Sequence, residues 1–178
     1  MAYRLYIAED YEKTIQRIMQ IDYPDHNAFY TSICCVSMLV ERMLDLSFPP
    51  DLCAHFARQC DVVDDSIESF LLLAGAVSGR FSLKLNVCSE DEAFARIKGK
   101  AKAIVQLKHP SDGQWRYYLL DHYCKNLFYF VNPSLQQSKG LPRSKKKLIQ
   151  LKDEYTLIPS ESYHIFYPED ANYYVYSI

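Results

Sequence analysis

Apolar residues recur at helical spacing through the first half of the chain. This period predicts one amphipathic helix and then a longer helix that is apolar on most sides and therefore packed on several faces. Two shorter helices are expected after it, the second ending where Gly79 could serve as the capping residue. In chain order, the four predicted helices cover residues 11–20, 29–46, 51–60 and 65 or 66 to 78.

After Arg80 the spacing of the apolar residues changes to two, which is typical of half-buried strands. A short helix with a capping box at Ser89 interrupts these strands. Two aromatic-rich strands then flank a turn, and the second of them ends in Asn132-Pro133. The predicted strands cover 81–87, 103–108, the two sides of a hairpin from 115 to 133, 155–158 and 173–178. Helices first and antiparallel strands second predict an α+β domain.

Size and charge narrow the class of protein. A chain of 178 residues is long enough to bury one core, so we expect a single domain over 1–178. The formal net charge of -2 gives the whole chain no attraction to nucleic acid. The 15 Tyr and 9 Phe are typical of a half-buried sheet whose hydroxyls reach water.

The apolar runs and the cysteines of the chain indicate where the protein is located and whether its thiols are free. No run approaches the roughly 20 apolar residues that span a bilayer, and the start of the chain has no apolar signal core. The expectation is a cytoplasmic protein, or one delivered by a non-classical secretion system. The 6 Cys lack CxxC spacing, which favours free thiols over a disulfide framework.

The order of these elements resembles the papain-like cysteine peptidases that trim bacteriocin leaders, a family often found at the amino terminus of peptide-exporting ABC transporters. The resemblance runs from about Asn27 to Asn132 and includes the strand 103–106 and the length of the hairpin 113–133. It implies a papain-like fold with a Cys at the start of the long helix. The His and the Asp or Asn of the catalytic triad would lie on the following sheet.

Under this resemblance the nucleophile falls on Cys34 or Cys35, and Cys35 fits the apolar positions that follow slightly better. A helix start would lower the thiol pKa through the helix dipole. The glutamine that builds the family's oxyanion hole falls on Ala28 or Phe29, which cannot donate a side-chain hydrogen bond. The alternative interpretation, which we favour, is that both cysteines are small apolar residues packed in a buried helix.

The spacing along the hairpin indicates which residues would match the family's catalytic His and the residue that orients it. Asn132 matches the orienting Asn of papain-like triads, but the family's spacing puts the His on Trp115, or on Arg116 with a one-residue slip. Neither residue can act as a general base near neutral pH. His109, at the end of the preceding strand, is the best substitute. His122 faces the opposite side from Trp115 if the strand is regular.

The favoured hypothesis is therefore a degenerate, non-catalytic peptidase-like domain that binds a peptide or protein partner. Trp115, Arg116 and Tyr117 are the predicted binding residues, because aromatic and arginine side chains are common at interfaces. The first alternative is an active cysteine peptidase or acyl transferase that uses Cys34 or Cys35 with His109. The second is an adaptor or immunity-type protein.

No cofactor and no metal are expected. Cys53 and His55 are two residues apart and would diverge around a helix, which argues against a zinc site. The last predicted strand, 173–178, is either paired within the sheet or an edge where a partner docks.

Overall fold

The computed structural model describes residues 4–21, 27–64, 66–108, 115–124, 127–133, 149–151, 155–159 and 171–178. Four described helices come before the first strand, and a fifth lies between β1 and β2. The helices are α1 (Ala8–Met19), α2 (Asn27–Leu44), α3 (Pro50–Gln59), α4 (Ile67–Phe81) and α5 (Glu90–Ile97). The strands are β1 (Lys84–Cys88), β2 (Lys102–Lys108), β3 (Trp115–Cys124), β4 (Leu127–Val131), β5 (Ile149–Leu151), β6 (Tyr155–Pro159) and β7 (Ala171–Ser177). The predicted α+β class, with helices first and an antiparallel sheet second, is confirmed.

The described strands form one 7-stranded sheet in the order β1-β7-β2-β3-β4-β6-β5, and every neighbouring pair is antiparallel. The C-terminal strand β7 lies between β1 and β2. It is therefore paired on both sides and is not a docking edge. Strand β5 was not anticipated from the sequence.

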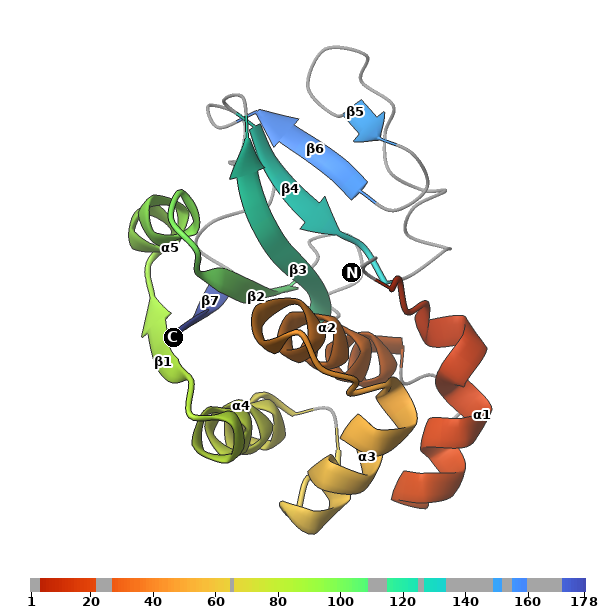
Figure 1. Cartoon of the computed structure of the whole chain (residues 1–178). Coiled ribbons are helices and arrows are strands. Elements are labelled where there is room, and N and C mark those ends of the chain that lie inside the picture. Colours follow the sequence, from red (N-terminus) through yellow and green to blue (C-terminus); the bar gives the residue numbers. More distant parts are fainter. Residues whose placement is uncertain are drawn as a thin grey trace.

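The two faces of the sheet carry two separate apolar clusters. Tyr117 and Leu119 of β3 belong to the larger cluster, which also contains the buried faces of α1 to α4. Tyr118 and Leu120 belong to the smaller cluster, which contains the apolar side of α5. Figure 1 shows α1 to α4 grouped together and α5 apart from them. The alternation along β3 thus separates a helical layer from a thin cover on the other face.

The start of α4 follows from its local sequence, whereas its end differs from the prediction. The Ser66 side chain accepts a hydrogen bond from the Ser69 backbone amide and caps α4, as expected. The helix does not end at Gly79 but continues to Phe81, and Ser82 takes the left-handed conformation with φ 54°. The longer helix lets Phe81 pack against the larger cluster and Leu83 join it. Tertiary packing therefore overrides the stop that Gly79 predicted.

Candidate functional site

The two helix cysteines lie inside α2, about two turns from its first residue. Cys34 and Cys35 are both 0% exposed. Burial raises the pKa of each thiol well above its ordinary value, because the thiolate would lose its hydration. The expectation that a helix start lowers these pKa values is therefore wrong. Two neutral thiols packed in the core are poor nucleophiles near neutral pH.

The start of β3 shows what occupies the predicted histidine position. Trp115 and Arg116 are half-buried, whereas Tyr117 is buried and in ring contact with Phe70 of α4 at a centroid distance of 4.7 Å. Phe29 from the beginning of α2 lies beside these rings. The cavity left between them is about 10 Å³, at most room for one water. Tyr117 thus belongs to the core and offers no surface to a partner.

A buried amide network supports the same end of the sheet. The Gln106 amide nitrogen donates to the Tyr117 hydroxyl at 2.7 Å, and its oxygen accepts from the Tyr174 hydroxyl at 3.0 Å. The Asn172 side chain donates to the same oxygen at 3.1 Å. Amides and phenols do not act as general bases at neutral pH. This network therefore holds the strands together without supplying a catalytic base.

The structure describes the proposed orienting residue, Asn132, but not the substitute base, His109. Asn132 follows β4 and is buried, and the next carbonyl, that of Pro133, accepts from the Ala8 backbone amide at 2.8 Å. The Asn132-Pro133 turn therefore fixes the beginning of α1 to the end of β4. His109 lies outside the described residues, so its role stays a prediction, as does the orienting role of Asn132.

A β-bulge in β3 changes the side of the sheet that His122 faces. The register with β4 shifts between Leu120 and His122, so His122 pairs with Tyr129. Tyr129 and Val131 are two residues apart on β4 and so point to the same face of the sheet. Val131 belongs to the larger cluster, so this face is the one that α1 to α4 cover. His122 therefore shares a face with Trp115, and the expectation that the two residues oppose each other is wrong, because it assumed a regular strand.

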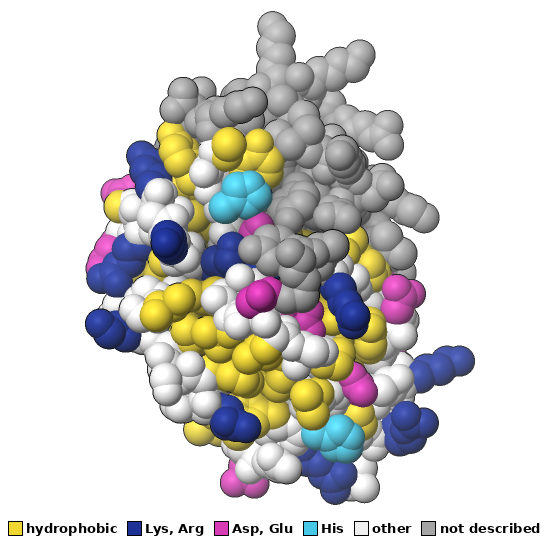
Figure 2. Space-filling model, viewed as in Figure 1, with side chains coloured by type: hydrophobic (Ala, Val, Ile, Leu, Met, Phe, Trp, Pro, Cys, Tyr) yellow, Lys and Arg dark blue, Asp and Glu magenta, His cyan; other side chains and the backbone are white. Residues whose placement is uncertain are grey.

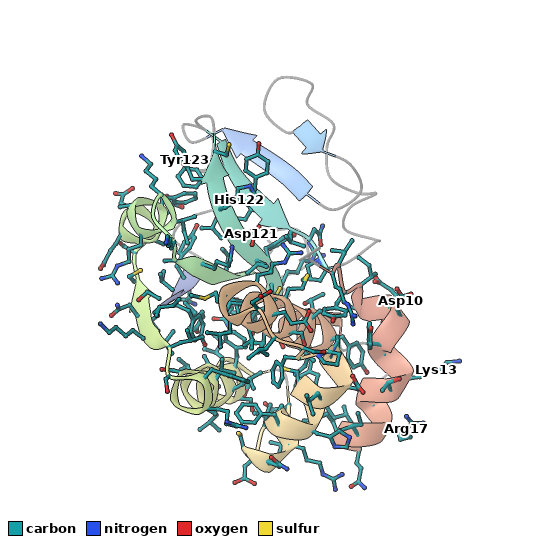
Figure 3. All side chains as sticks on the ribbon, viewed as in Figure 1. Asp10, Lys13, Arg17, Asp121, His122 and Tyr123 are labelled. Carbon is teal, nitrogen blue, oxygen red and sulfur yellow. The ribbon has the colours of Figure 1, made fainter. Side chains whose placement is uncertain are left out.

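Asp121, the bulge residue (Figure 3), organises a group of charges near the C-terminal end of α2. Its carboxylate accepts from Lys102 Nζ at 2.9 Å and lies 3.4 Å from an Arg42 guanidinium nitrogen. The His122 imidazole Nδ1 lies 2.8 Å from Oδ2, the carboxylate oxygen that also faces Arg42. The imidazole ring stacks on Tyr129 at a centroid distance of 4.3 Å. The His122 side chain is 43% exposed, whereas that of Asp121 is 2% exposed. The arrangement is an oriented, accessible imidazole on a buried carboxylate.

Electrostatics keep this carboxylate ionised. Burial alone would raise the pKa of Asp121, but the hydrogen bond from His122 and the charges of Lys102 and Arg42 outweigh it. The pKa of Asp121 is consequently far below its usual range. Sequence reasoning missed this residue. The available signal was one acidic residue in an otherwise apolar run, which requires cationic partners when buried.

A metal site and a membrane-spanning helix are both missing from the described part of the chain. There, His, Cys, Asp and Glu side chains form no group of three that could hold a metal ion. Cys53 is fully buried and His55 is exposed, so the two residues diverge around α3 as predicted. None of the described helices is long and apolar enough to cross a bilayer.

Comparisons with known proteins add one structural likeness. No family model matches the chain, and neither does any curated protein sequence. Among solved structures, the chain is similar to the Pseudomonas avirulence protein AvrPphB. The match covers 90% of this chain and 100% of that chain, with 10% sequence identity and a TM-score of 0.40. A likeness of this size assigns neither a family nor a function, and the description of the fold stands on its own elements.

Proposed function

We propose that this chain is a degenerate papain-like domain that binds a peptide or protein partner without cleaving it. The element order supports the proposal, because a long helix that carries cysteines precedes an antiparallel sheet with a hairpin ending in Asn132-Pro133. Absence of cleavage is favoured by Trp115, which occupies the position where the resemblance expects a histidine. Indole nitrogen only donates a hydrogen bond and cannot take the proton of a thiol.

The single observation that carries the proposal is the burial of Cys34 and Cys35 with raised thiol pKa values. A catalytic thiol must meet its substrate and ionise, and it is normally helped by an adjacent base. Among the described residues, the aromatic packing of Phe29, Phe70 and Tyr117 leaves no room for a substrate at the beginning of α2. Binding must then use another surface of the molecule.

Alkylation resolved by cysteine tests this proposal. The native protein is treated with iodoacetamide at neutral pH, and each site is followed by peptide mass spectrometry. Exposed Cys124 should react rapidly, whereas Cys34 and Cys35 should react only in urea, when the chain unfolds. Rapid native labelling of Cys34 or Cys35 that is lost in His109→Ala would overturn the proposal and identify an active enzyme.

One observation favours a second candidate, a thiol-dependent peptidase or acyl transferase. Cys124 is exposed and lies two residues after His122, so both are on the same face of β3 beyond the bulge. The hydrogen bond between His122 and Asp121 would orient the imidazole as a base.

The same alkylation series tests this candidate. If His122 activates Cys124, the second-order rate constant of Cys124 should exceed that of free cysteine by about tenfold or more, and His122→Gln should abolish the excess. Equal rates for the native protein, His122→Gln and free cysteine would exclude it. Alkylation of Cys124→Ala, followed at the remaining sites, controls for the other cysteines.

A further inference from the structure

A pocket lies where the last residues before α3 meet α3 and the end of α4. Its floor consists of three phenylalanine rings in mutual contact. The ring of Phe48 is 5.0 Å from that of Phe81 and 6.2 Å from that of Phe56, with steep interplanar angles of 73° and 70°. The cavity volume is about 310 Å³. This size is at the lower end for small-molecule sites and suits one large side chain with its neighbouring backbone.

The floor is held in place by a charged residue of α2. The Phe48 backbone amide donates to a Glu41 carboxylate oxygen at 2.7 Å, and the Tyr6 hydroxyl donates to the same oxygen at 2.8 Å. Phe48 itself is buried. These intramolecular contacts fix the backbone of Phe48, so little conformational entropy should be lost when a ring enters the pocket.

The border of the pocket is apolar and accessible. Leu52 is 48% exposed and Leu46 is 36% exposed, although both line the cavity. Figure 2 shows a broad apolar area on this face of the molecule, with basic side chains and a histidine at its lower border. Contiguous apolar surface with a polar rim is typical of a binding site.

The pocket lining contains a cationic side chain and no acidic one. Arg80 and His55 line the pocket, and no acidic side chain does. The Arg80 guanidinium lies 5.7 Å from the centroid of the Phe81 ring, at the edge of the aromatic floor. Within the described part of the chain, neither Arg80 nor His55 has an ion pair. A ligand that places a carboxylate next to an aromatic ring therefore complements this lining.

We propose that this pocket binds an acidic peptide segment through one aromatic side chain flanked by Asp or Glu. The inference deepens the proposed function and rests on it, since it assigns the surface on which a non-catalytic domain would hold its partner. The aromatic ring enters between Phe48, Phe56 and Phe81, and a flanking carboxylate pairs with Arg80. The Gln59 amide and the Ser47 hydroxyl, which also line the pocket, are available for the peptide backbone.

Capped pentapeptides provide the probes. The sequence Gly-Asp-Phe-Asp-Gly is titrated into the ¹⁵N-labelled full chain, and amide chemical shifts are followed by NMR. Gly-Asp-Ala-Asp-Gly tests the need for the ring, and Gly-Lys-Phe-Lys-Gly tests the sign of the charge. We expect saturable shifts at residues 46–59 and 80–81 with the first peptide, and at least about fivefold weaker binding of the other two.

Charge variants locate the contact. Arg80→Glu and Leu52→Asp change exposed side chains, so the fold should be kept, and each should weaken binding of Gly-Asp-Phe-Asp-Gly by about fivefold. Arg17→Glu is the matched control, because Arg17 is an exposed side chain of α1 (Figure 3) that does not line the pocket. It should leave the affinity unchanged.

The possible outcomes separate this inference from the proposed function. Shifts confined to other surfaces, or equal weakening by Arg17→Glu, would overturn the pocket assignment while binding itself stands. Equal binding of the lysine peptide would overturn the acidic specificity. No shift at millimolar peptide would overturn the pocket assignment as well. The proposed function would in that case still be decided by the alkylation rates of Cys34 and Cys35.

Discussion

The two ends of helix α2 have opposite characters. At its beginning, Phe29 packs with Phe70 and Tyr117 in an apolar core that leaves almost no cavity. At its end, Arg42 meets the buried carboxylate of Asp121, and Glu41 anchors the loop that leads to the pocket. Under the resemblance on which the proposed function rests, the nucleophile would lie at the beginning of this helix. Among the described residues, the ion pairs that involve α2 lie at its other end, so the order of elements alone does not give the position of a site.

The strongest test of this comparison is a cavity made at the beginning of α2. Phe70→Ala removes a ring that is 4% exposed and contacts both Tyr117 and Tyr174. We expect the free energy of unfolding, measured by urea denaturation, to fall by about 4 kcal/mol. Leu71→Ala, at a neighbouring residue that is 45% exposed, should change it by less than about 1 kcal/mol. A small loss for Phe70→Ala would mean that these rings line an open groove rather than the core.

The charged group around Asp121, at the C-terminal end of α2, should also contribute strongly to the free energy of unfolding. Asp121→Ala leaves the cations of Arg42 and Lys102 without their buried anion. We expect a loss of about 3 kcal/mol in the free energy of unfolding. Glu92→Ala, which breaks an exposed pair with Arg96, should lose less than about 1 kcal/mol and serves as the control. Similar losses for the two variants would contradict the buried character of the Asp121 group.

Acid should weaken the same end selectively. Because the folded-state pKa of Asp121 lies below its unfolded value near 3.9, its contribution to stability is complete above that value. The contribution is lost progressively as pH falls below about 4 towards the folded-state pKa, on the order of 1 kcal/mol by pH 3 and more at lower pH. Urea denaturation at pH 7 and pH 3 measures the difference. Asp121→Asn should have a flatter profile, and an unchanged profile would show that other carboxylates cause the acid sensitivity.

The smallest expected effect concerns the exposed imidazole. His122→Phe keeps a ring to stack on Tyr129 but removes the hydrogen bond to Asp121. Because the side chain is 43% exposed, we expect the free energy of unfolding to fall by only about 1 kcal/mol. His122→Ala, which also removes the stacked ring, should cost more. A loss of about 3 kcal/mol for His122→Phe would instead mean that His122 contributes as much to stability as Asp121.

Local patterns predicted the elements well and their ends less well. The apolar helix 29–46 appears as α2 over Asn27–Leu44, and Ser89 caps α5 by accepting from the Glu92 backbone amide, as its spacing indicated. The extension of α4 past Gly79 and the three-residue strand β5 escaped prediction. Helix ends and short strands depend on packing against distant residues, which no local pattern contains.

The candidate site was less predictable for a related reason. Sequence order suggested cysteines at a helix start and one regular strand that carries Trp115 and His122. The cysteines instead lie inside α2 and are buried in the larger apolar cluster, and the bulge at Asp121 reverses the face of His122. A bulge is the insertion of one residue into a ladder, and it is defined only by the partner strand.

Sequence patterns were enough to predict the α+β class, the order of the described helices and strands apart from β5, and the lack of a histidine at the start of the hairpin. These follow from the period of apolar residues and from residue identity, which are local properties. The folded structure was needed to show which thiols are buried, which cations pair with Asp121, and that Phe48, Phe56 and Phe81 meet in a pocket. Desolvation and Coulomb interactions depend on distances between segments that are far apart in the chain, and folding alone sets those distances.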